Sequence, residues 1–346
     1  SAVLLALALP VLGLTLGSPQ LSGITSDSAG SQAITRAIGS GVPDGVLRPV
    51  EVLADGGEAE ELGPVEGVAA VSAPADAAWR DAGTQLLQVY LADDPASADG
   101  KAALERVRTQ VGKAEVGGSA AEDADFVTAV YGDAVWVVLA IIVVTFLLLA
   151  RALRSMWLPV KALALNVVSI AAAYGVTVLI WQEGIGSELL FGQPATGVIT
   201  TWVPIAAFAF LFGLSMDYEV FILARMREAY DEHGDTDRAV VDGISHTGRL
   251  VTSAALILFL SFVALSTVPS VEVKILATTL ALGILLDAVV VRGLLAPALV
   301  AALGYLNWTM PGLLRRVLRV SDQRSYLRPP RASRNARSTS AVDRTP

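Results

Sequence analysis

Two acidic residues stand inside long apolar stretches of the chain, where a charge is costly. Asp217 lies in the apolar run that starts at Trp202, and Asp287 lies in the run that starts at Val271. Each run is long enough to cross a bilayer core, which takes about 20 residues. A carboxylate at membrane depth costs at least about 2.5 kcal/mol, so it is a candidate either for proton transfer or for a structural ion pair. Two such carboxylates at one level predict a proton-carrying pair.

The residues around the two aspartates repeat the same spacing. Gly213 precedes Asp217 by four residues, and Gly283 precedes Asp287 by four. In an α-helix each glycine therefore lies one turn away on the same face as its aspartate. Small residues at such positions let membrane helices approach closely. At 1.5 Å per residue both aspartates lie about 22–24 Å below the outer helix end. We therefore expect the two helices to meet along these glycines and to bring the carboxylates together.

The composition is that of a polytopic membrane protein with a substantial polar part. Of the 346 residues, 53% are hydrophobic and 17% are charged, and the mean hydropathy is +0.58. The sequence has no cysteine and two histidines, which excludes disulfides, thiolate metal sites, cysteine nucleophiles and a histidine-rich metal site. No catalytic constellation stands out, so we expect no enzyme activity, no cofactor and no metal.

Six apolar segments are expected to cross the membrane. Residues 1–17 are interpreted as a transmembrane helix that lacks its beginning, so the chain looks like a fragment; a signal peptide is the alternative for this segment. The other five spans lie within residues 133–304, which we expect to form a bundle. They are Ala134–Ala150, Ala162–Trp181, Trp202–Ala224, Leu250–Val268 and Lys274–Leu303, with a charged loop at Arg225–Arg249. Residues 305–346 are expected to be an arginine-rich, disordered tail.

Residues 18–132 are polar and acidic and predict an α+β domain inserted between the first and second spans. The pattern indicates strands at Leu47–Ala54, Val65–Ser72 and Gln85–Leu91, with a fourth closed by Gly117-Gly118. Short helices are expected at Ile34–Ile38 and near Glu58–Leu62, and a longer one at Ser97–Val111 with Ser97 as its cap. The order strand–helix–strand, strand–helix–strand is that of a ferredoxin-like domain.

The distribution of charge predicts the orientation. Residues 21–133 hold 19 acidic and 7 basic side chains, whereas residues 312–346 hold 2 acidic and 9 basic ones. Loops 151–161 and 225–249 are also basic, whereas 182–201 and 269–273 contain no Lys or Arg. The positive-inside rule places the basic loops and both termini in the cytoplasm and residues 18–132 outside the cytoplasmic membrane. Such asymmetry fits a multi-pass membrane protein better than a nucleic-acid partner.

Three motifs and the order of the segments resemble one repeat of the resistance–nodulation–division superfamily, closest to its MmpL branch. The motifs are Phe-Gly-Leu-Ser-Met-Asp-Tyr-Glu-Val-Phe at 212–221, Thr-Gly-Arg-Leu-Val-Thr-Ser-Ala-Ala at 247–255, and Gly-Ile-Leu-Leu-Asp-Ala-Val-Val-Val-Arg at 283–292. The likeness covers nearly the whole chain and is strongest from 197 to 300. Family members carry two such repeats, and this chain is similar to the second. The resemblance therefore implies a partner, either a missing N-terminal repeat or a second half-unit.

The resemblance also implies a bacterial transporter that exports lipids or other hydrophobic molecules and is driven by protons flowing inward. In that family an Asp–Tyr pair on the fourth span carries the protons, which corresponds to Asp217 and Tyr218. The charged residues of the family's last span correspond to Asp287 and Arg292. These two are five residues apart, about 140° around an α-helix, so we expect them on different faces. Arg292 is then expected to reach the cytoplasmic interface or another helix.

Two other functions would also use buried carboxylates. A related fold occurs in sterol-sensing and Patched-like proteins, which handle lipid or act as receptors without pumping, and this stays the alternative. Intramembrane aspartyl proteases carry Tyr-Asp and Gly-x-Gly-Asp on adjacent spans. Here the order is Asp217-Tyr218, and Gly283-Ile-Leu-Leu precedes Asp287, which disfavours a protease.

Overall fold

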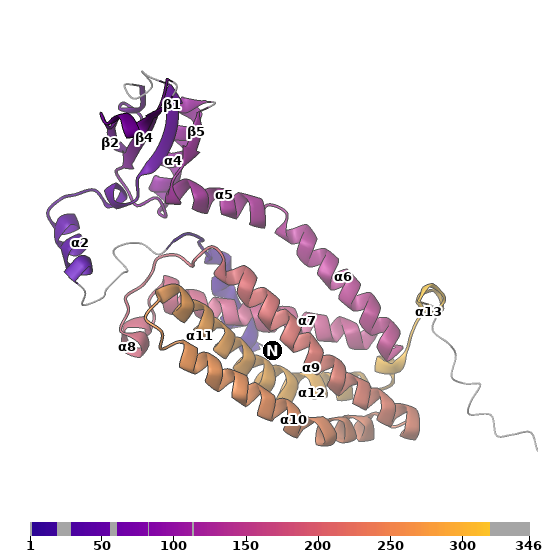
Figure 1. Ribbon diagram of the computed structural model, residues 1–346. Coiled ribbons are helices and arrows are strands. Elements are labelled where there is room, and N and C mark those ends of the chain that lie inside the picture. The colour runs from indigo at the N-terminus through magenta and orange to yellow at the C-terminus, as the bar shows by residue number, and fades with distance from the viewer. Residues whose placement is uncertain (1, 19–28, 56–60, 82, 113, 319–346) are drawn as a thin grey trace, which may run out of the picture.

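A computed structural model describes residues 2–18, 29–55, 61–81, 83–112 and 114–318. Its helices form an elongated bundle, and a small sheet with covering helices lies beyond one end of it (Figure 1). Helices α5 (Ser119–Tyr131) and α6 (Ala134–Leu153) lead from the sheet to the far end of the bundle, where α13 (Gly312–Val317) lies. We call the end that faces the sheet the sheet end and the other end the tail end.

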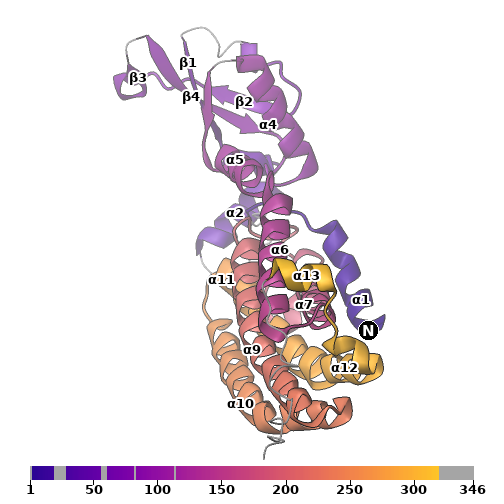
Figure 2. The same cartoon turned by 90° about the vertical axis from the view of Figure 1, so that its right-hand side faces the viewer.

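The sheet is antiparallel, with strand order β2-β4-β1-β5. Its strands are β1 (Val50–Asp55), β2 (Val68–Ser72), β4 (Thr84–Leu91) and β5 (Glu115–Gly117), and the short β3 (Arg80–Asp81) pairs with β4. Alternate residues point inward, as the period of two in a strand requires. Buried side chains of β1 and β4 thus meet those of α4 (Ala98–Val111) in one core, which includes Val52, Val89, Leu104 and Val107. Figure 2 shows α4 lying along the sheet.

The predicted strands and the long helix of this domain are confirmed within one to three residues. Ser97 caps α4 as expected, because its hydroxyl accepts a hydrogen bond of 3.0 Å from the Gly100 amide. The helix expected at Ile34–Ile38 is α2 (Ala29–Gly39). The helix expected near Glu58–Leu62 falls largely on residues 56–60, outside the described residues. The ferredoxin-like assignment depends on that connection and stays a prediction.

Among the described residues, five helices are long and apolar enough to cross a membrane. They run over Ser119–Leu153, Trp157–Gln182, Val203–His233, Thr236–Leu265 and Val271–Trp308. The second comprises α7 (Trp157–Thr177) and a π-helical turn, η5 (Val178–Gln182); the third and fourth are α9 and α10. The last comprises α11 (Val271–Leu285), the π-helix η6 (Leu286–Leu295), α12 (Ala296–Leu303) and η7 (Gly304–Trp308).

The apolar helix at Ala2–Gly13 is shorter than these five and consists of α1 (Ala2–Ala8) and η1 (Leu9–Gly13). It packs against α7, where Gly175 leaves room for the Leu7 carbonyl. Leu4 is buried in a cluster with Ala172 of α7 and Val291 of η6. The described structure thus contains five membrane-length helices and one shorter apolar helix in contact with them.

The charged loop expected at Arg225–Arg249 is wrong, because almost all of it is helical. Helix α9 continues to His233 and α10 begins at Thr236. Gly234 ends α9 with a φ of 69°, a backbone conformation that favours glycine. Asp235 caps α10, because its carboxylate accepts from the amides of Asp237 and Arg238. These polar turns extend the helices beyond their apolar parts.

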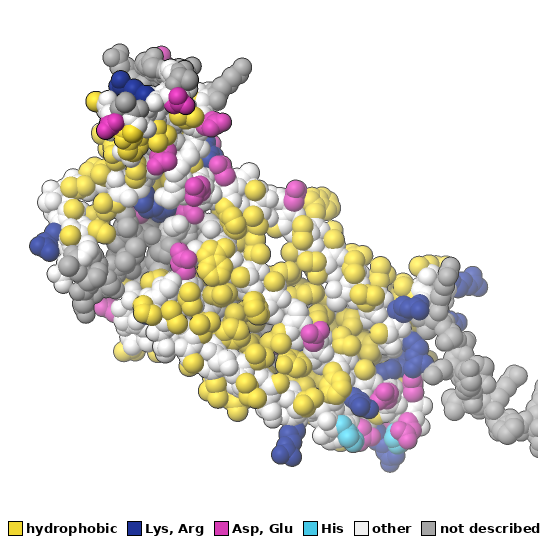
Figure 3. Space-filling view, viewed as in Figure 1, with side chains coloured by type: hydrophobic (Ala, Val, Ile, Leu, Met, Phe, Trp, Pro, Cys, Tyr) yellow, Lys and Arg dark blue, Asp and Glu magenta, His cyan; other side chains and the backbone are white. Residues whose placement is uncertain are grey.

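Hydrophobic side chains cover the face of the bundle that Figure 3 shows. Charged side chains gather on the sheet domain and at the tail end in the same view. A water-soluble monomer seldom exposes so large an apolar surface. The surface therefore fits a bundle that stands in a bilayer between two polar ends.

Candidate functional site

Asp287 and Arg292 form a buried ion pair within the last span. The Arg292 Nη2 and Asp287 Oδ2 atoms lie 2.5 Å apart, and the two side chains are 6% and 13% exposed. The expectation that they lie on different faces is wrong, because the backbone from Leu286 to Leu295 is π-helical. Hydrogen bonds in a π-helix join residues five apart, which places residues i and i+5 over one another. The π-helix thus builds an ion pair that an α-helix would separate.

The Arg292 guanidinium also joins η6 to α9. Its Nη2 donates to the Ser215 carbonyl oxygen at 2.7 Å and to the Ser215 hydroxyl at 3.0 Å. The Tyr218 ring lies beneath it, with 5.2 Å between the guanidinium carbon and the ring centroid. Arg292 therefore reaches another helix, as one of the two sequence expectations stated. Its carboxylate, hydroxyl, carbonyl and aromatic contacts are buried between helices, where charge interactions are strong.

The structure does not bring Asp217 and Asp287 together. Asp217 lies on an exposed face of α9, whereas Glu219 of the same motif is buried, with 5% of its surface exposed. Residues two apart in an α-helix point about 200° from one another, so only one of these acids can face the bundle. Glu219 lies close enough to Asp287, Arg292 and Lys161 to interact with their charges. The expected aspartate pair is corrected to a buried group of Glu219, Asp287 and Arg292.

The two glycines lie in different surroundings. A Cβ atom added to Gly283 would lie 2.6 Å from the side chain of Leu211 on α9, which is closer than real Cβ atoms approach. Gly283 thus allows α11 and α9 to pack closely, as its position predicts. Gly213 has an exposed surface, and an added Cβ would meet no atom within 4 Å. In the described part of the chain Gly213 therefore has no helix against it, and the expected contact there is corrected.

Two further charges, the partly buried Lys161 and the buried Glu219, were not expected at the site. Lys161 was counted in a basic loop, but it lies in α7, where its ammonium donates to the Asn307 side-chain oxygen and, at 3.4 Å, to the Leu299 carbonyl. Glu219 stands two residues from Asp217 in the motif. Which of the two acids faces inward depends on the rotation of α9 about its own axis. A sequence motif does not determine that rotation.

A small cavity of about 20 Å³ lies beside the ion pair. Its polar lining comes from three helices: α7 supplies Asn166 and Ser169, α9 supplies Ser215 and Tyr218, and the last span supplies Asp287 and Arg292. Three of the four residues predicted for proton transfer, Tyr218, Asp287 and Arg292, therefore share one polar cavity between membrane-length helices. Asp217 is the residue that stands outside it.

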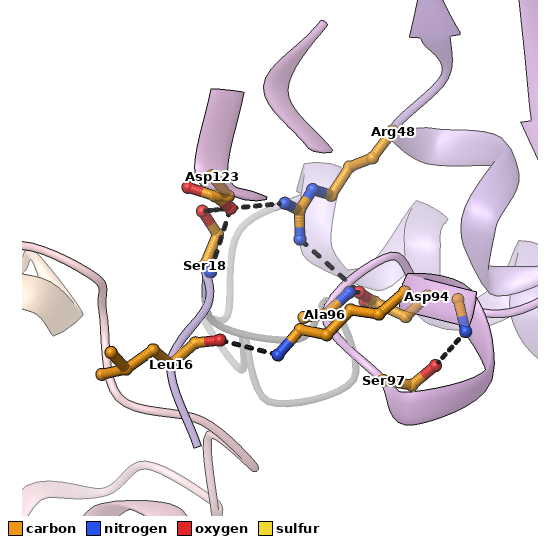
Figure 4. Close-up of polar contacts among 9 residues, drawn as sticks. Leu16, Ser18, Arg48, Asp94, Ala96, Ser97 and Asp123 are labelled. Atoms are coloured by element: carbon orange, nitrogen blue, oxygen red, sulfur yellow. Dashed lines mark hydrogen bonds and ion pairs between the residues drawn. The ribbon is translucent and has the colours of Figure 1, made fainter. Parts of the chain in front are cut away.

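A second polar group ties the sheet domain to the bundle (Figure 4). Arg48 lies between two carboxylates, 3.0 Å from Asp123 of α5 and 3.5 Å from Asp94. Asp123 also accepts hydrogen bonds from the amide and hydroxyl of Ser18, at 3.1 and 2.5 Å. The Lys101 ammonium of α4 donates to the Leu16 carbonyl at 2.8 Å. We call Ser18, Arg48, Asp94, Lys101 and Asp123 the junction cluster.

The junction cluster stands at a cavity of about 440 Å³ between the sheet domain, α5 and the segment 14–17. Its lining is mostly apolar, with Leu14, Leu16, Leu104 and Val127 among the contacts, and Arg48, Lys101 and Asp123 add charge. Burial lowers the pKa of the Lys101 ammonium, and the Asp123 carboxylate opposes that shift. Apolar walls with a few polar groups are typical of small-molecule sites of this size.

Membrane-length helices, buried charges between them and a polar domain at one end define a polytopic membrane protein. A family model supports this class directly, since the model described as MMPL family matches residues 51–334. The chain belongs to the MMPL family. The resemblance that the three motifs carry is thereby confirmed.

Named relatives agree with the family. The chain is 34% identical over 342 residues to the Heme uptake protein MmpL11 of Mycobacterium tuberculosis, which is 92% of this chain and 35% of the relative. It is 31% identical over 340 residues to the Mycolic acid-containing lipids exporter MmpL11 of Mycolicibacterium smegmatis, covering 91% and 35%. It is 37% identical over 325 residues to the Putative membrane protein SCO6666 of Streptomyces coelicolor, covering 90% and 44%. The chain thus spans about a third of the MmpL11 relatives and under half of the Streptomyces protein.

Proposed function

We propose that the chain forms part of a transporter that uses the inward flow of protons to export lipids or other hydrophobic molecules across the cytoplasmic membrane. The observation that carries this proposal is the Asp287–Arg292 pair, buried between membrane-length helices in a chain of the MMPL family. Intramembrane ionisable residues are rare and mark proton relays and substrate paths. Tyr218 lines the same cavity as this pair. Glu219 is buried on α9, whereas Asp217 lies on an exposed face of that helix.

Protonation of Asp287 would change the packing of two helices. The charged carboxylate holds the Arg292 guanidinium, which at the same time holds Ser215 of α9. A neutral carboxyl group attracts the guanidinium less, so Arg292 would shift towards its α9 partners. We propose that this exchange moves η6 against α9 in each proton cycle. Asp287 would bind a proton from one side of the membrane and release it to the other side. The helices would move after each of these steps.

Asp217 is proposed to act at an interface with a second repeat. It belongs to a stripe of exposed residues that winds along α9 in steps of four positions: Ile205, Ala209, Gly213, Asp217 and Phe221. The spacing of four residues makes the stripe continuous, and Ala209 and Gly213 leave room for another helix. A carboxylate facing lipid would be costly, whereas a partner helix could cover it. A missing N-terminal repeat or a second half-unit would supply that helix.

The substrate class is proposed from the relatives and from the junction cavity. One MmpL11 relative is named for mycolic acid-containing lipids and another for heme, which are both hydrophobic molecules. The cavity at the junction cluster has apolar walls that suit such a molecule, and α5 and α6 connect it to the bundle. We propose that helix movement reaches the cavity through Asp123 on α5. In this arrangement six spans cross the membrane, the sheet domain lies outside and both termini lie in the cytoplasm.

Transport can be tested with the protein and its second repeat in lipid vesicles. An imposed proton gradient should drive movement of a labelled mycolic lipid in the direction opposite to the protons, and a protonophore should stop it. Labelled heme in parallel vesicles tests the other named substrate and the direction of its movement. Binding of either molecule without gradient-driven movement would contradict the proposal and favour a Patched-like lipid-handling protein.

A further inference from the structure

Asn166 is a buried polar side chain whose amide stands unpaired. It lies on α7 with 1% of its surface exposed. Among the described residues, neither its Oδ1 nor its Nδ2 atom has a hydrogen-bond partner. An amide buried without partners costs about 1–3 kcal/mol on protein scales, so an arrangement that satisfies it is strongly favoured. The place to look for that partner is the cavity that Asn166 lines.

Two more unpaired atoms belong to the same cavity. The Asp287 Oδ1 and the Arg292 Nε atoms are buried and have no hydrogen-bond partner within the described part of the chain, although the same two side chains pair through their other atoms. Asn166, Asp287 and Arg292 all line the cavity of about 20 Å³. The set contains two acceptors, Asn166 Oδ1 and Asp287 Oδ1, and two donors, Asn166 Nδ2 and Arg292 Nε.

We propose that this cavity is a hydration site that holds one water molecule between Asn166 and the Asp287–Arg292 pair, and that Asn166 is a positioning residue for the proposed proton transfer. The positioning role of Asn166 in proton transfer rests on the proposed function. A water molecule donates two hydrogen bonds and accepts two, which matches the unpaired donors and acceptors of the cavity. The volume is sufficient, because one water needs about 10–15 Å³ of such space and two to four polar partners.

The water gives Asp287 a second stabilising contact. Oδ2 of Asp287 faces the Arg292 guanidinium, and the water donates to Oδ1, so that both oxygens of the ionised carboxylate are satisfied. Asn166 holds the water from α7, which itself takes no part in the ion pair. The site thus joins a third helix to the contact between α9 and η6. Replacing the Asn166 side chain should change the pH at which Asp287 binds a proton, because hydrogen bonds to a carboxylate favour its charged form.

The hydration site can be tested by pulsed X-ray radiolysis of the protein in nanodiscs. Hydroxyl radicals formed from a bound water label the side chains beside it, so Tyr218 should be labelled promptly in the wild type. Asn166→Leu, which has a similar size and no polar group, should lose most of this labelling. Asn166→Ser, which leaves a hydroxyl and more space, should keep it. Thr177→Val removes a buried hydroxyl elsewhere on α7 and should leave the labelling unchanged.

Transport assays test the positioning role. The pH profile of gradient-driven transport should shift by about half a pH unit or more in Asn166→Leu, and Asn166→Ser should restore the wild-type profile. Absent Tyr218 labelling in the wild type, or equal labelling in Asn166→Leu, would overturn the hydration site. An unshifted profile in Asn166→Leu would overturn the positioning role. If the wild type moves no protons, the proposed function fails, whereas the labelling still decides whether the water is present.

Discussion

At the scale of single residues, Arg292 is the side chain on which the buried site depends. Its guanidinium contacts Asp287, Ser215 and the Tyr218 ring at once. Arginine suits this position because its planar group donates in several directions and also stacks on aromatic rings. The ion pair itself adds little stability over an apolar pair of similar size, but removing one partner leaves the other charge buried without compensation.

Loss of one charge should therefore destabilise the protein more than loss of both. Asp287→Asn should lower the free energy of unfolding by about 3 kcal/mol, since breaking a buried pair costs about 3–5 kcal/mol and the amide keeps part of the hydrogen bonding. The double variant Asp287→Asn with Arg292→Met should recover much of that loss. Reversible unfolding in mixed detergent micelles measures both, with Glu232→Gln at the exposed end of α9 as a control. A double variant less stable than Asp287→Asn would refute this explanation.

The residue types of the site could be predicted from sequence, but the directions in which they point could not. The cost of burying charge in a membrane is enough to single out Asp217 and Asp287 from the amino-acid sequence, whereas Arg292 and Tyr218 follow from the resemblance to the family. The choice between Asp217 and Glu219 depends on the rotation of α9, which neighbouring helices set. The orphan amide of Asn166 carries no motif at all, because one asparagine in an apolar run has no sequence pattern that reveals its partners.

At the scale of helices, the last span is shaped by the π-helix from Leu286 to Leu295 and by Gly283 one turn before Asp287. The glycine lets α11 approach Leu211 of α9, and the π-helix then brings Asp287 and Arg292 onto one face. Helix propensity does not predict this π-helix, because the residues from Val289 to Val291 are equally compatible with an α-helix. The spans themselves were predictable from apolar length, whereas their polar extensions at Arg225–Arg249 were not, because no apolar run marks them.

Close packing at Gly283 can be tested by adding one methyl group. Gly283→Ala should destabilise the bundle by about 1–3 kcal/mol, because the new Cβ overlaps the Leu211 side chain. Leu211→Ala in the same protein should recover part of this loss by making room. Gly213→Ala is the matched control and should be neutral in the isolated chain, since its Cβ would meet no atom within 4 Å. Equal effects of the two glycine changes on thermal unfolding would show that α11 and α9 do not pack as described.

At the scale of the whole molecule, the junction cluster connects the sheet domain to the bundle. Arg48 stands between Asp94 of the sheet domain and Asp123 of α5 (Figure 4). Helix α5 continues towards the bundle through α6 (Figure 1). The Arg48 and Asp94 side chains are only 12% and 7% exposed, so breaking this pair should cost more than breaking an ion pair in solvent. The cluster therefore contributes to the stability of this region as well as to the relative position of its parts.

Breaking the junction cluster should loosen the connection between the two parts. Arg48→Met keeps most of the side-chain length but removes both ion pairs, so the sheet domain should move more freely against α5. Spin labels on Thr109 of α4 and Glu232 of α9 should show a broader distance distribution in this variant. Arg106→Met is the control, because Arg106 contacts Glu66 on the exposed side of the domain. An unchanged distribution in Arg48→Met would mean that other contacts fix the junction.

The proposed orientation places the two ends of the molecule on opposite sides of the membrane. The sequence has no cysteine, so single cysteines are unique labels. Thr109→Cys, on the sheet domain, should react with an impermeant maleimide added outside intact cells. Glu232→Cys, at the tail end, should react only after the cells are opened. Reaction of both residues from the same side would contradict the proposed arrangement of the spans.

The central claim is that carboxylates on the membrane-length helices of this chain carry the protons that drive transport. It is tested most directly by gradient-driven substrate movement in vesicles containing Asp287→Asn with Arg292→Met, a pair expected to fold but unable to exchange a proton. Asp217→Asn is measured beside it, and Glu232→Gln serves as the control. The account predicts that both site variants fall to the level of empty vesicles while the control keeps wild-type transport. Wild-type transport by the Asp287→Asn, Arg292→Met protein would show that the buried pair is only structural.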